Sequence, residues 1–164
     1  MEKSDVAPAK ELRVYNWRTD EYLLVDWYAK LIQNGDMVLV FAPDMRYLGN
    51  FLAHFRKLTL GYACDKDGIF FACWLEPLLS GANFGVWVRE NMRHAPTTLR
   101  LLTTAYNEAF KVFTVLLGLC KQPALEDIHR KLGYKKAFTI PALWNGEDVD
   151  VYVITQDMWL NRKH

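Results

Sequence analysis

Apolar and polar residues follow one another along the chain in patterns that predict a mixture of strands and helices. Runs with strand-like alternation or continuous apolar character are separated by Gly, Asp and Pro, which favour turns. The predicted strands cover residues 12–17, 37–42, 58–64, 69–77, 83–90, 114–120, 137–144 and 149–156. Asp-Lys-Asp-Gly between the third and fourth of them is a turn signal, so these two strands are expected to form a hairpin.

Apolar residues spaced three or four apart predict helices between the strands. The predicted helices cover residues 19–35, 43–58, 96–113 and 123–133, with a closing helical turn at 155–162. In the first helix, Thr19 or Asp20 can act as the N-cap, and Gly35 lies just past the end. The third helix begins with Pro96, because proline suits the first position of a helix.

The order of these elements predicts the fold class. Three strands in series form an antiparallel meander, and a β-α-β-α-β-β arrangement follows it. This order is typical of a single α/β domain with a mixed central sheet flanked by helices. A chain of 164 residues suits one domain. Residues 1–11 are polar and are expected to form a flexible N-terminal arm, which leaves residues 12–164 for the domain.

Composition and charge limit the kinds of molecule that the protein is expected to bind and the cellular compartment in which it is expected to lie. Hydrophobic residues make up 51% of the chain, which is enough for a substantial core. The net charge of +1 gives no electrostatic reason to expect nucleic acid. No apolar run reaches the length of a membrane span, and the charged first residues do not resemble a signal peptide. The sequence therefore predicts a cytoplasmic protein, or one packaged into a larger assembly.

The cysteines and histidines do not form a metal-binding pattern. The three cysteines, Cys64, Cys73 and Cys120, are widely spaced, which fits neither a disulfide framework nor a zinc site. His54 and His94 also lack metal-ligand spacing. We expect free thiols, buried in a reducing compartment, and no metal.

Three features together resemble the GNAT superfamily of acyl-CoA-dependent N-acetyltransferases. The strand at 83–90 is followed by a tight loop and a long helix, and the buried strand at 114–120 comes directly after that helix. The segment Lys-Gln-Pro-Ala-Leu-Glu-Asp-Ile-His-Arg-Lys-Leu-Gly-Tyr, residues 121–134, is similar to the late segment of the family. The similarity covers residues 58–155. It implies a GNAT-like fold and transfer of an acetyl group from acetyl-CoA to an unidentified amine by direct attack on the thioester.

The resemblance implies a cofactor loop at the start of the long helix. The family places there a Gln/Arg-x-x-Gly-x-Gly/Ala loop, whose backbone N–H groups hold the pyrophosphate of CoA. The corresponding residues 93–98 read Arg-His-Ala-Pro-Thr-Thr, so Arg93 matches while Pro96 and Thr98 replace the small residues. Proline removes an N–H donor and threonine adds bulk. The Thr97 and Thr98 hydroxyls, with Arg93, are expected to replace lost contacts; the alternative is a plain helix start with a solvated arginine.

The strand before that loop is expected to lie beside the pantetheine arm. In the family this strand splays from its parallel neighbour and leaves backbone groups free to bond the amides of the cofactor. The corresponding candidates here are Val86, Trp87, Val88 and, next to the loop, Arg89. Gly85 marks either a bulge in the strand or close packing under aromatic side chains.

The late segment supplies the candidate general acid. Alignment with the family pattern puts His129 where a tyrosine acid usually lies, and Gln122 where an asparagine usually lies. Because the ordinary pKa of histidine is near 6.5, His129 could protonate the leaving thiolate. Gln122 could bond the pantetheine or the carbonyl. The alternative is that His129 is a boundary residue near a helix end at Gly133, where a cation is favourable.

The general base has two candidates. Glu76 ends one central strand and Glu90 ends another, and either carboxylate could face a substrate cleft or be merely solvated. Cys120 could act as a nucleophile with His129 as its base, or remain an inert buried thiol.

A second function stays open at this point. The altered loop and the absence of the family tyrosine and asparagine permit a catalytically inactive GNAT-fold protein that acts as a binding or structural component. The tryptophan-rich chain is similar to small GNAT-like proteins of tailed bacteriophages, which would place it in the host cytoplasm or the virion. Either function permits a homo-oligomer or a larger assembly. The following aromatic residues either line an acceptor pocket or pack in the core: Trp17, Tyr22, Trp27, Tyr28, Phe51, Phe55, Trp144 and Tyr152.

Overall fold

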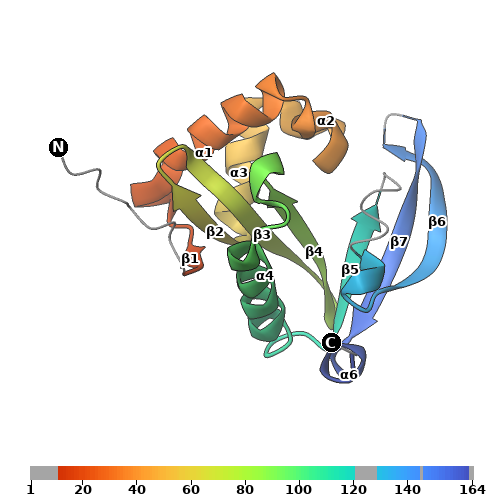
Figure 1. The fold of residues 1–164 in the computed structure, drawn as a ribbon. Helices are drawn as coiled ribbons and strands as arrows, with labels where there is room; N and C mark the ends of the chain where they lie inside the picture. The colour runs from red at the N-terminus through yellow and green to blue at the C-terminus, as the bar shows by residue number, and fades with distance from the viewer. Residues whose placement is uncertain (1–10, 121–128, 145, 163–164) are drawn as a thin grey trace.

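A seven-stranded mixed sheet forms the centre of the computed structural model, which describes residues 11–120, 129–144 and 146–162 (Figure 1). The strands are β1 (Arg13–Val14), β2 (Thr59–Asp65), β3 (Gly68–Leu78), β4 (Gly81–Val88), β5 (Val115–Cys120), β6 (Lys135–Trp144) and β7 (Glu147–Thr155). The helices are α1 (Trp17–Gln33), α2 (Asp36–Val40), α3 (Leu48–Lys57), α4 (Pro96–Ala109) and α6 (Gln156–Leu160), with 3-10 turns η1 (Pro43–Arg46) and η2 (Glu90–Met92).

The strand order β1-β2-β3-β4-β5-β7-β6 combines two antiparallel parts. Strands β1 to β4 form an antiparallel meander, and β5, β7 and β6 form a second antiparallel group. The two groups meet where β4 pairs with β5 in parallel, with α4 as the crossover. The predicted α/β class and mixed sheet are therefore confirmed.

The two faces of the sheet carry separate cores because successive side chains of a strand point to opposite faces. On one face, Trp27 of α1 and Phe55 of α3 pack in an aromatic cluster with Trp74 of β3. On the other face, Tyr106 of α4 packs against Phe84 of β4, in the same cluster as Ile154 and Trp159. Figure 1 shows α1 and α3 on one side of the sheet and α4 on the other.

The first helix begins earlier than the sequence pattern predicts. Asn16 is the N-cap, and its side chain accepts a hydrogen bond from the N–H of Arg18. Asp20 turns back and accepts the N–H of Asn16 at 3.0 Å. The prediction of Thr19 or Asp20 as the cap is wrong, because Asp20 supports the cap from inside the first turn.

The strand predicted at residues 37–42 is also wrong, since Asp36–Val40 form the helix α2. Gly35 adopts a φ of 81° and turns the chain sharply after α1. The segment then folds over the sheet and buries Met37 and Phe41, which are four residues apart. An apolar run this short fits a strand or a helix equally well.

Three other boundaries differ from the predicted ones. The helix predicted at 43–58 is divided by the extended residue Tyr47 into η1 and α3. The long helix ends at Ala109 instead of residue 113, and the first strand shrinks to Arg13–Val14. The closing helical turn is present as α6.

The helix that precedes β6 ends as its sequence predicts. Gly133 has a φ of 98°, its N–H donates to the carbonyl of Arg130, and the N–H of Tyr134 donates to the carbonyl of His129. This pair of bonds is a Schellman motif, in which glycine takes the left-handed position. The ring of Tyr134 packs edge-on against His129, which fixes the histidine at the helix end.

Candidate functional site

Strands β4 and β5 separate soon after they meet. Their parallel pairing covers only Gly81–Asn83 and Val115–Leu117, although β4 continues to Val88 and β5 to Cys120. Figure 1 shows the two strands diverging from their shared start. We call this region, residues 83–88 and 117–120, the β4–β5 fork. Beyond the Asn83–Leu117 pair, neither strand has a partner strand on its inner edge among the described residues, so backbone groups of both can bind a ligand.

Hydrogen bonding to β3 shows which groups of β4 face the fork. The N–H of Arg89 donates to Phe70 of β3 at 2.9 Å, and the backbone groups of a strand alternate in direction. Val88 and Val86 therefore face away from β3. The carbonyl of Val88 accepts a hydrogen bond from Nε of Arg93 at 3.4 Å. Val86 thus presents both its N–H and its carbonyl to the fork.

The loop between β4 and α4 carries the altered glycine positions. Thr98 is buried, its hydroxyl donates to the carbonyl of Met92 at 2.6 Å, and its N–H donates to Ala95 at 3.0 Å. Pro96 has no N–H. The N–H of Thr97 bonds no group in the described part of the chain. The start of α4 therefore offers one free donor in its first turn, and Thr98 holds the loop closed from inside.

Arg89 lies next to this loop but is engaged elsewhere. Its guanidinium forms two hydrogen bonds with the carboxylate of Asp65, at 2.6 and 3.0 Å, and also donates to the carbonyls of Gly68 and Ile69. Burial opposes ionisation of Asp65, but the Arg89 hydrogen bonds and the N–H of Asp67 outweigh it and lower the pKa of Asp65. Arg89 therefore fastens the end of β4 to the β2–β3 turn.

The Asp65–Arg89 pair predicts a pH-dependent contribution to stability. We expect Arg89→Met to lower the free energy of unfolding by about 2 kcal/mol at about pH 7, because it leaves a hydrogen-bonded carboxylate without its charged donor. Since the pKa of Asp65 is lowered by folding, its contribution is present above the ordinary value of about 3.9 and fades as pH falls below it. The difference between wild type and variant should therefore shrink toward about pH 3.

Urea unfolding followed by circular dichroism at both pH values measures this effect. The matched control is Arg56→Met, because Arg56 pairs with Glu21 at a more exposed position. That variant should lose less than about 1 kcal/mol. A loss at Arg89 that stayed constant with pH would contradict the role assigned to Asp65.

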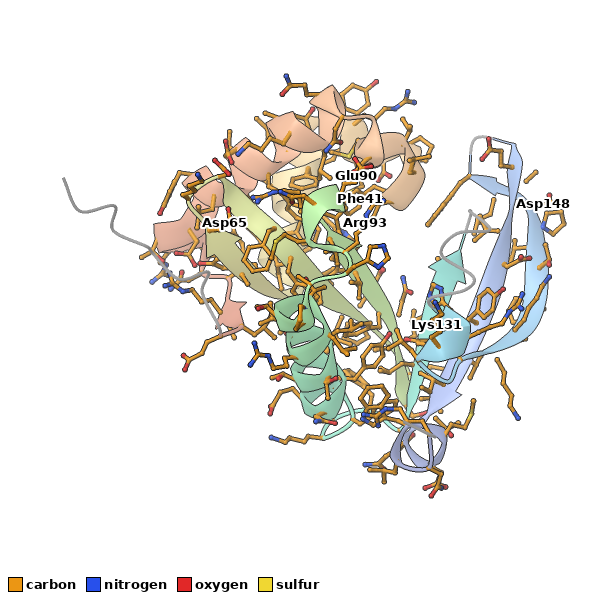
Figure 2. The ribbon with its side chains drawn as sticks, viewed as in Figure 1. Phe41, Asp65, Glu90, Arg93, Lys131 and Asp148 are labelled. Atoms are coloured by element: carbon orange, nitrogen blue, oxygen red, sulfur yellow. The ribbon has the colours of Figure 1, made fainter. Side chains whose placement is uncertain are left out.

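A pocket of about 390 Å³ lies beside the loop. Its lining comes from the α1–α2 turn and from the segment after β4, and consists of Asn34, Asp36, Arg89, Glu90, Asn91 and Arg93. Asp36 accepts a hydrogen bond from Nε1 of Trp87 at 3.0 Å, so the Trp87 side chain joins α2 to β4. Figure 2 shows Glu90 and Arg93 in this loop.

His129 lies against β5 inside the fork. A Cβ atom on Gly118 would be 2.6 Å from Nε2 of His129, so only glycine leaves room for the imidazole. The ring stacks on Tyr152 with centroids 5.1 Å apart and meets Tyr134 at 5.0 Å. Because Leu116, two residues before Gly118, packs in the α4-side core, His129 lies on that same face of the sheet.

The two candidate bases lie at opposite ends of β4. Glu76 pairs with Asn83, the last β4 residue that pairs with β5, and it projects from the same face as Trp74, toward α1 and α3. Burial lowers the pKa of His54 of α3, and the negative charge of Glu76 opposes part of this shift. Glu90 is exposed in η2, beyond the other end of the strand. Glu76 therefore lies at the base of the fork, and Glu90 lies by the loop.

Of the predicted site residues, Glu76, Val86 and His129 lie on the strands of the fork or against them, with Glu76 and His129 on opposite faces of the sheet, and Arg93 and Thr97 lie at the start of α4. Gln122 and the side chain of Cys120 lie outside what the structure describes. Of the two alternatives predicted for Gly85, the structure shows close packing under an aromatic ring, that of Trp74, and the β3–β4 register has no bulge there. Among the described residues, no group of three or more metal-ligating side chains could hold an ion. None of the helices in the described ranges has the length and apolar character needed to cross a membrane.

Comparisons with known proteins identify the fold. No family model and no curated protein matches the sequence. Among solved structures, a ribosomal-protein-S5-alanine acetyltransferase from Vibrio fischeri has a TM-score of 0.68 at 12% identity, covering 90% of this chain and 93% of that one. A spermidine N-acetyltransferase chimera from Vibrio cholerae and hSSAT has a TM-score of 0.67 at 14% identity, covering 93% and 98%. A Salmonella typhimurium protein solved with its cofactor acetyl-CoA has a TM-score of 0.67 at 11% identity, covering 94% and 95%.

These similarities establish the fold. The neighbouring structures are GNAT acetyltransferases, and they match this chain over nearly its whole length. The chain therefore has the GNAT fold that the sequence resemblance predicted.

Proposed function

We propose that this chain transfers an acetyl group from acetyl-CoA to an amine acceptor by direct attack of the amine on the thioester. The observation that carries this proposal is the β4–β5 fork, where an open strand edge lies between Glu76 on one face of the sheet and His129 on the other. The GNAT fold and the acetyl-CoA in a similar structure support the cofactor. The names of the S5-alanine and spermidine acetyltransferases support an amine acceptor.

The cofactor fits the donors that this chain leaves free. The carbonyl of Val86 suits an amide N–H of the pantetheine arm, and its N–H is left for another acceptor of the cofactor, since both groups lie on an open edge. The guanidinium of Arg93 and the N–H of Thr97 suit the pyrophosphate, because they add a charge and a backbone donor at a helix start. Arg89 and Thr98 act indirectly by holding the loop in place. Gln122 remains a predicted contact.

The acid and the base act from opposite faces of the sheet. Glu76 accepts a proton from the amine, directly or through a water molecule, so that the nitrogen lone pair is available. The nitrogen forms the new C–N bond and releases its second proton to water, the C–S bond breaks, and His129 in its protonated form gives a proton to the departing thiolate. This arrangement separates the incoming amine from the leaving sulfur.

Thermal unfolding with and without acetyl-CoA tests the proposal. At a hundred times its Kd, acetyl-CoA should stabilise the protein by about 2.7 kcal/mol, which corresponds to a rise in Tm of about 5–10 °C for a chain of this size. Arg93→Ala should weaken acetyl-CoA binding about tenfold at low salt, since it removes one charged hydrogen bond. Arg100→Ala is the matched control, because Arg100 is exposed on the same helix, beyond its first turn.

Activity is then sought with an amine panel that includes spermidine and peptides with an N-terminal alanine, by following release of the CoA thiol. No change in Tm at millimolar acetyl-CoA would refute the proposal. It would favour the alternative of a catalytically inactive protein, which the replacement of the loop glycines also supports. The cytoplasmic or virion location, the bacteriophage origin and the oligomeric state stay predictions from the sequence.

A further inference from the structure

The indole ring of Trp74 covers β4 at Gly85, within the fork. A Cβ atom on Gly85 would lie 2.0 Å from Cε2 and 2.2 Å from Nε1 of Trp74, so no other residue than glycine admits the ring in this position. Trp74 and Gly85 are directly paired across β3 and β4. Gly85 lies two residues beyond Asn83, where the pairing with β5 ends. The edge of the indole that carries the N–H group therefore lies over the strand at the opening of the fork.

Neighbouring rings hold the indole in this place. Phe41 stacks on Trp74 with centroids 5.2 Å apart and an interplanar angle of 21°. Phe55 meets it edge-on at 5.6 Å, and Trp27 meets it at 6.3 Å. Only 6% of Trp74 is exposed. The direction of its N–H group is thus fixed before any ligand binds, which is the condition for efficient electrostatic stabilisation.

The N–H group of Trp74 has no acceptor among the residues that the structure describes. Trp87 and Trp159 donate to Asp36 and Asn107, and Nε1 of Trp27 is sealed in the core without a partner. Nε1 of Trp74 forms no hydrogen bond in the described part of the chain, yet it is not among the sealed atoms. The atom therefore keeps some access, and an acceptor that reaches it from the fork can take up this donor.

We infer that the Trp74 indole donates a hydrogen bond to the acyl carbonyl of bound acetyl-CoA. The inference rests on the proposed function and identifies a residue that distinguishes acetyl-CoA from CoA. Val86, next to Gly85, offers its N–H from the strand edge, and Trp74 offers its N–H from the face toward α1 and α3. A carbonyl oxygen has two lone pairs and can accept both. The two donors polarise the carbonyl on the face where Glu76 lies.

The Trp74→Phe variant tests this inference, because phenylalanine keeps an aromatic ring and removes the N–H group. Isothermal titration measures Kd for acetyl-CoA and for CoA, which lacks the acyl carbonyl. In wild type, acetyl-CoA should bind more tightly than CoA. In Trp74→Phe that preference should fall about fivefold, through weaker binding of acetyl-CoA, while the Kd for CoA stays unchanged.

Trp159→Phe is the matched control. It makes the same chemical change on the other face of the sheet and removes the hydrogen bond to Asn107. The control should lose stability but keep the preference for acetyl-CoA over CoA. This comparison separates a general loss of packing from the loss of one donor at the fork.

The outcomes are distinguishable. If Trp74→Phe binds both ligands with the wild-type preference, the inference is wrong and the proposed function stands. If wild type binds neither acetyl-CoA nor CoA, the inference and the proposed function are both wrong. Should Trp74→Phe not fold, the ¹⁵N-indole NMR spectrum of wild type gives the answer, since the chain has six tryptophans. The Trp74 signal, assigned by elimination with phenylalanine variants of the others, should shift with acetyl-CoA and not with CoA; equal shifts overturn the inference.

Discussion

Replacing Trp27 with alanine is expected to lower the free energy of unfolding by about 4 kcal/mol. Only 1% of this side chain is exposed. Its ring contacts five others, with centroid distances between 5.4 and 6.3 Å, namely Phe41, Phe51, Phe55, Trp74 and Trp87. The cavity left by alanine would remove the element that joins α1, α3 and the sheet. Urea unfolding followed by circular dichroism measures the loss.

Two further variants show whether packing is the cause. Trp27→Phe keeps a ring and removes a buried N–H group without a partner, so its cost should be about 1 kcal/mol. Trp17→Ala changes the exposed tryptophan at the start of α1, whose ring lies under the guanidinium groups of Arg18 and Arg56, and should cost about 1 kcal/mol or less. If Trp27→Ala cost no more than Trp17→Ala, the aromatic cluster would not be the core of this face.

Local signals predicted the elements that depend on neighbouring residues. The Asp-Lys-Asp-Gly turn between β2 and β3 and the glycine stop at Gly133 follow from the conformational needs of turns and helix ends. The start of α4 at Pro96 follows from the fixed φ angle of proline. In each case a few adjacent residues determine the outcome, so one sequence is enough.

The strand prediction for residues 37–42 was wrong because the structure of this segment depends on residues far from it. Its apolar residues pack on the sheet as helix α2, and the choice between helix and strand depends on where α1 ends and on the space above β4. Neither is visible in a run of six residues. The N-cap of α1 was misplaced for a similar reason, since Asn16, Thr19 and Asp20 are all good caps and the chain uses the first of them.

The site shows the same division. The resemblance named residues 83–98 and His129 as candidates, because sequence order follows the fold there. It gave no means to see that Arg89 is engaged by Asp65, or that Trp74 lies over Gly85. Both contacts join residues on different strands, and only the register of β2, β3 and β4 brings them together. A one-residue slip in that register would turn these side chains to the opposite face.

The register of β3 is the reason why the proposal assigns the base to Glu76 and not to Glu90. We expect Glu76→Gln to lower kcat/KM for the best amine of the panel by about 10² to 10³. Glutamine has nearly the same shape, so the Kd for acetyl-CoA and the Tm should stay near their wild-type values. The loss should shrink as pH rises toward the pKa of the acceptor, about 10 for a simple amine, because the free amine then forms without a base.

Glu108→Gln is the matched control, because Glu108 is exposed on α4 and pairs only with Lys111 in the described structure. It should leave kcat/KM unchanged. Glu90→Gln provides the decisive comparison. Glu90 lies in the segment between β4 and α4, beyond the far end of β4, whereas Glu76 lies beside Asn83, where the fork begins. A loss of transfer in Glu90→Gln with full activity in Glu76→Gln would show that the amine approaches from the loop, and the acid and base would then not lie on opposite faces of the sheet.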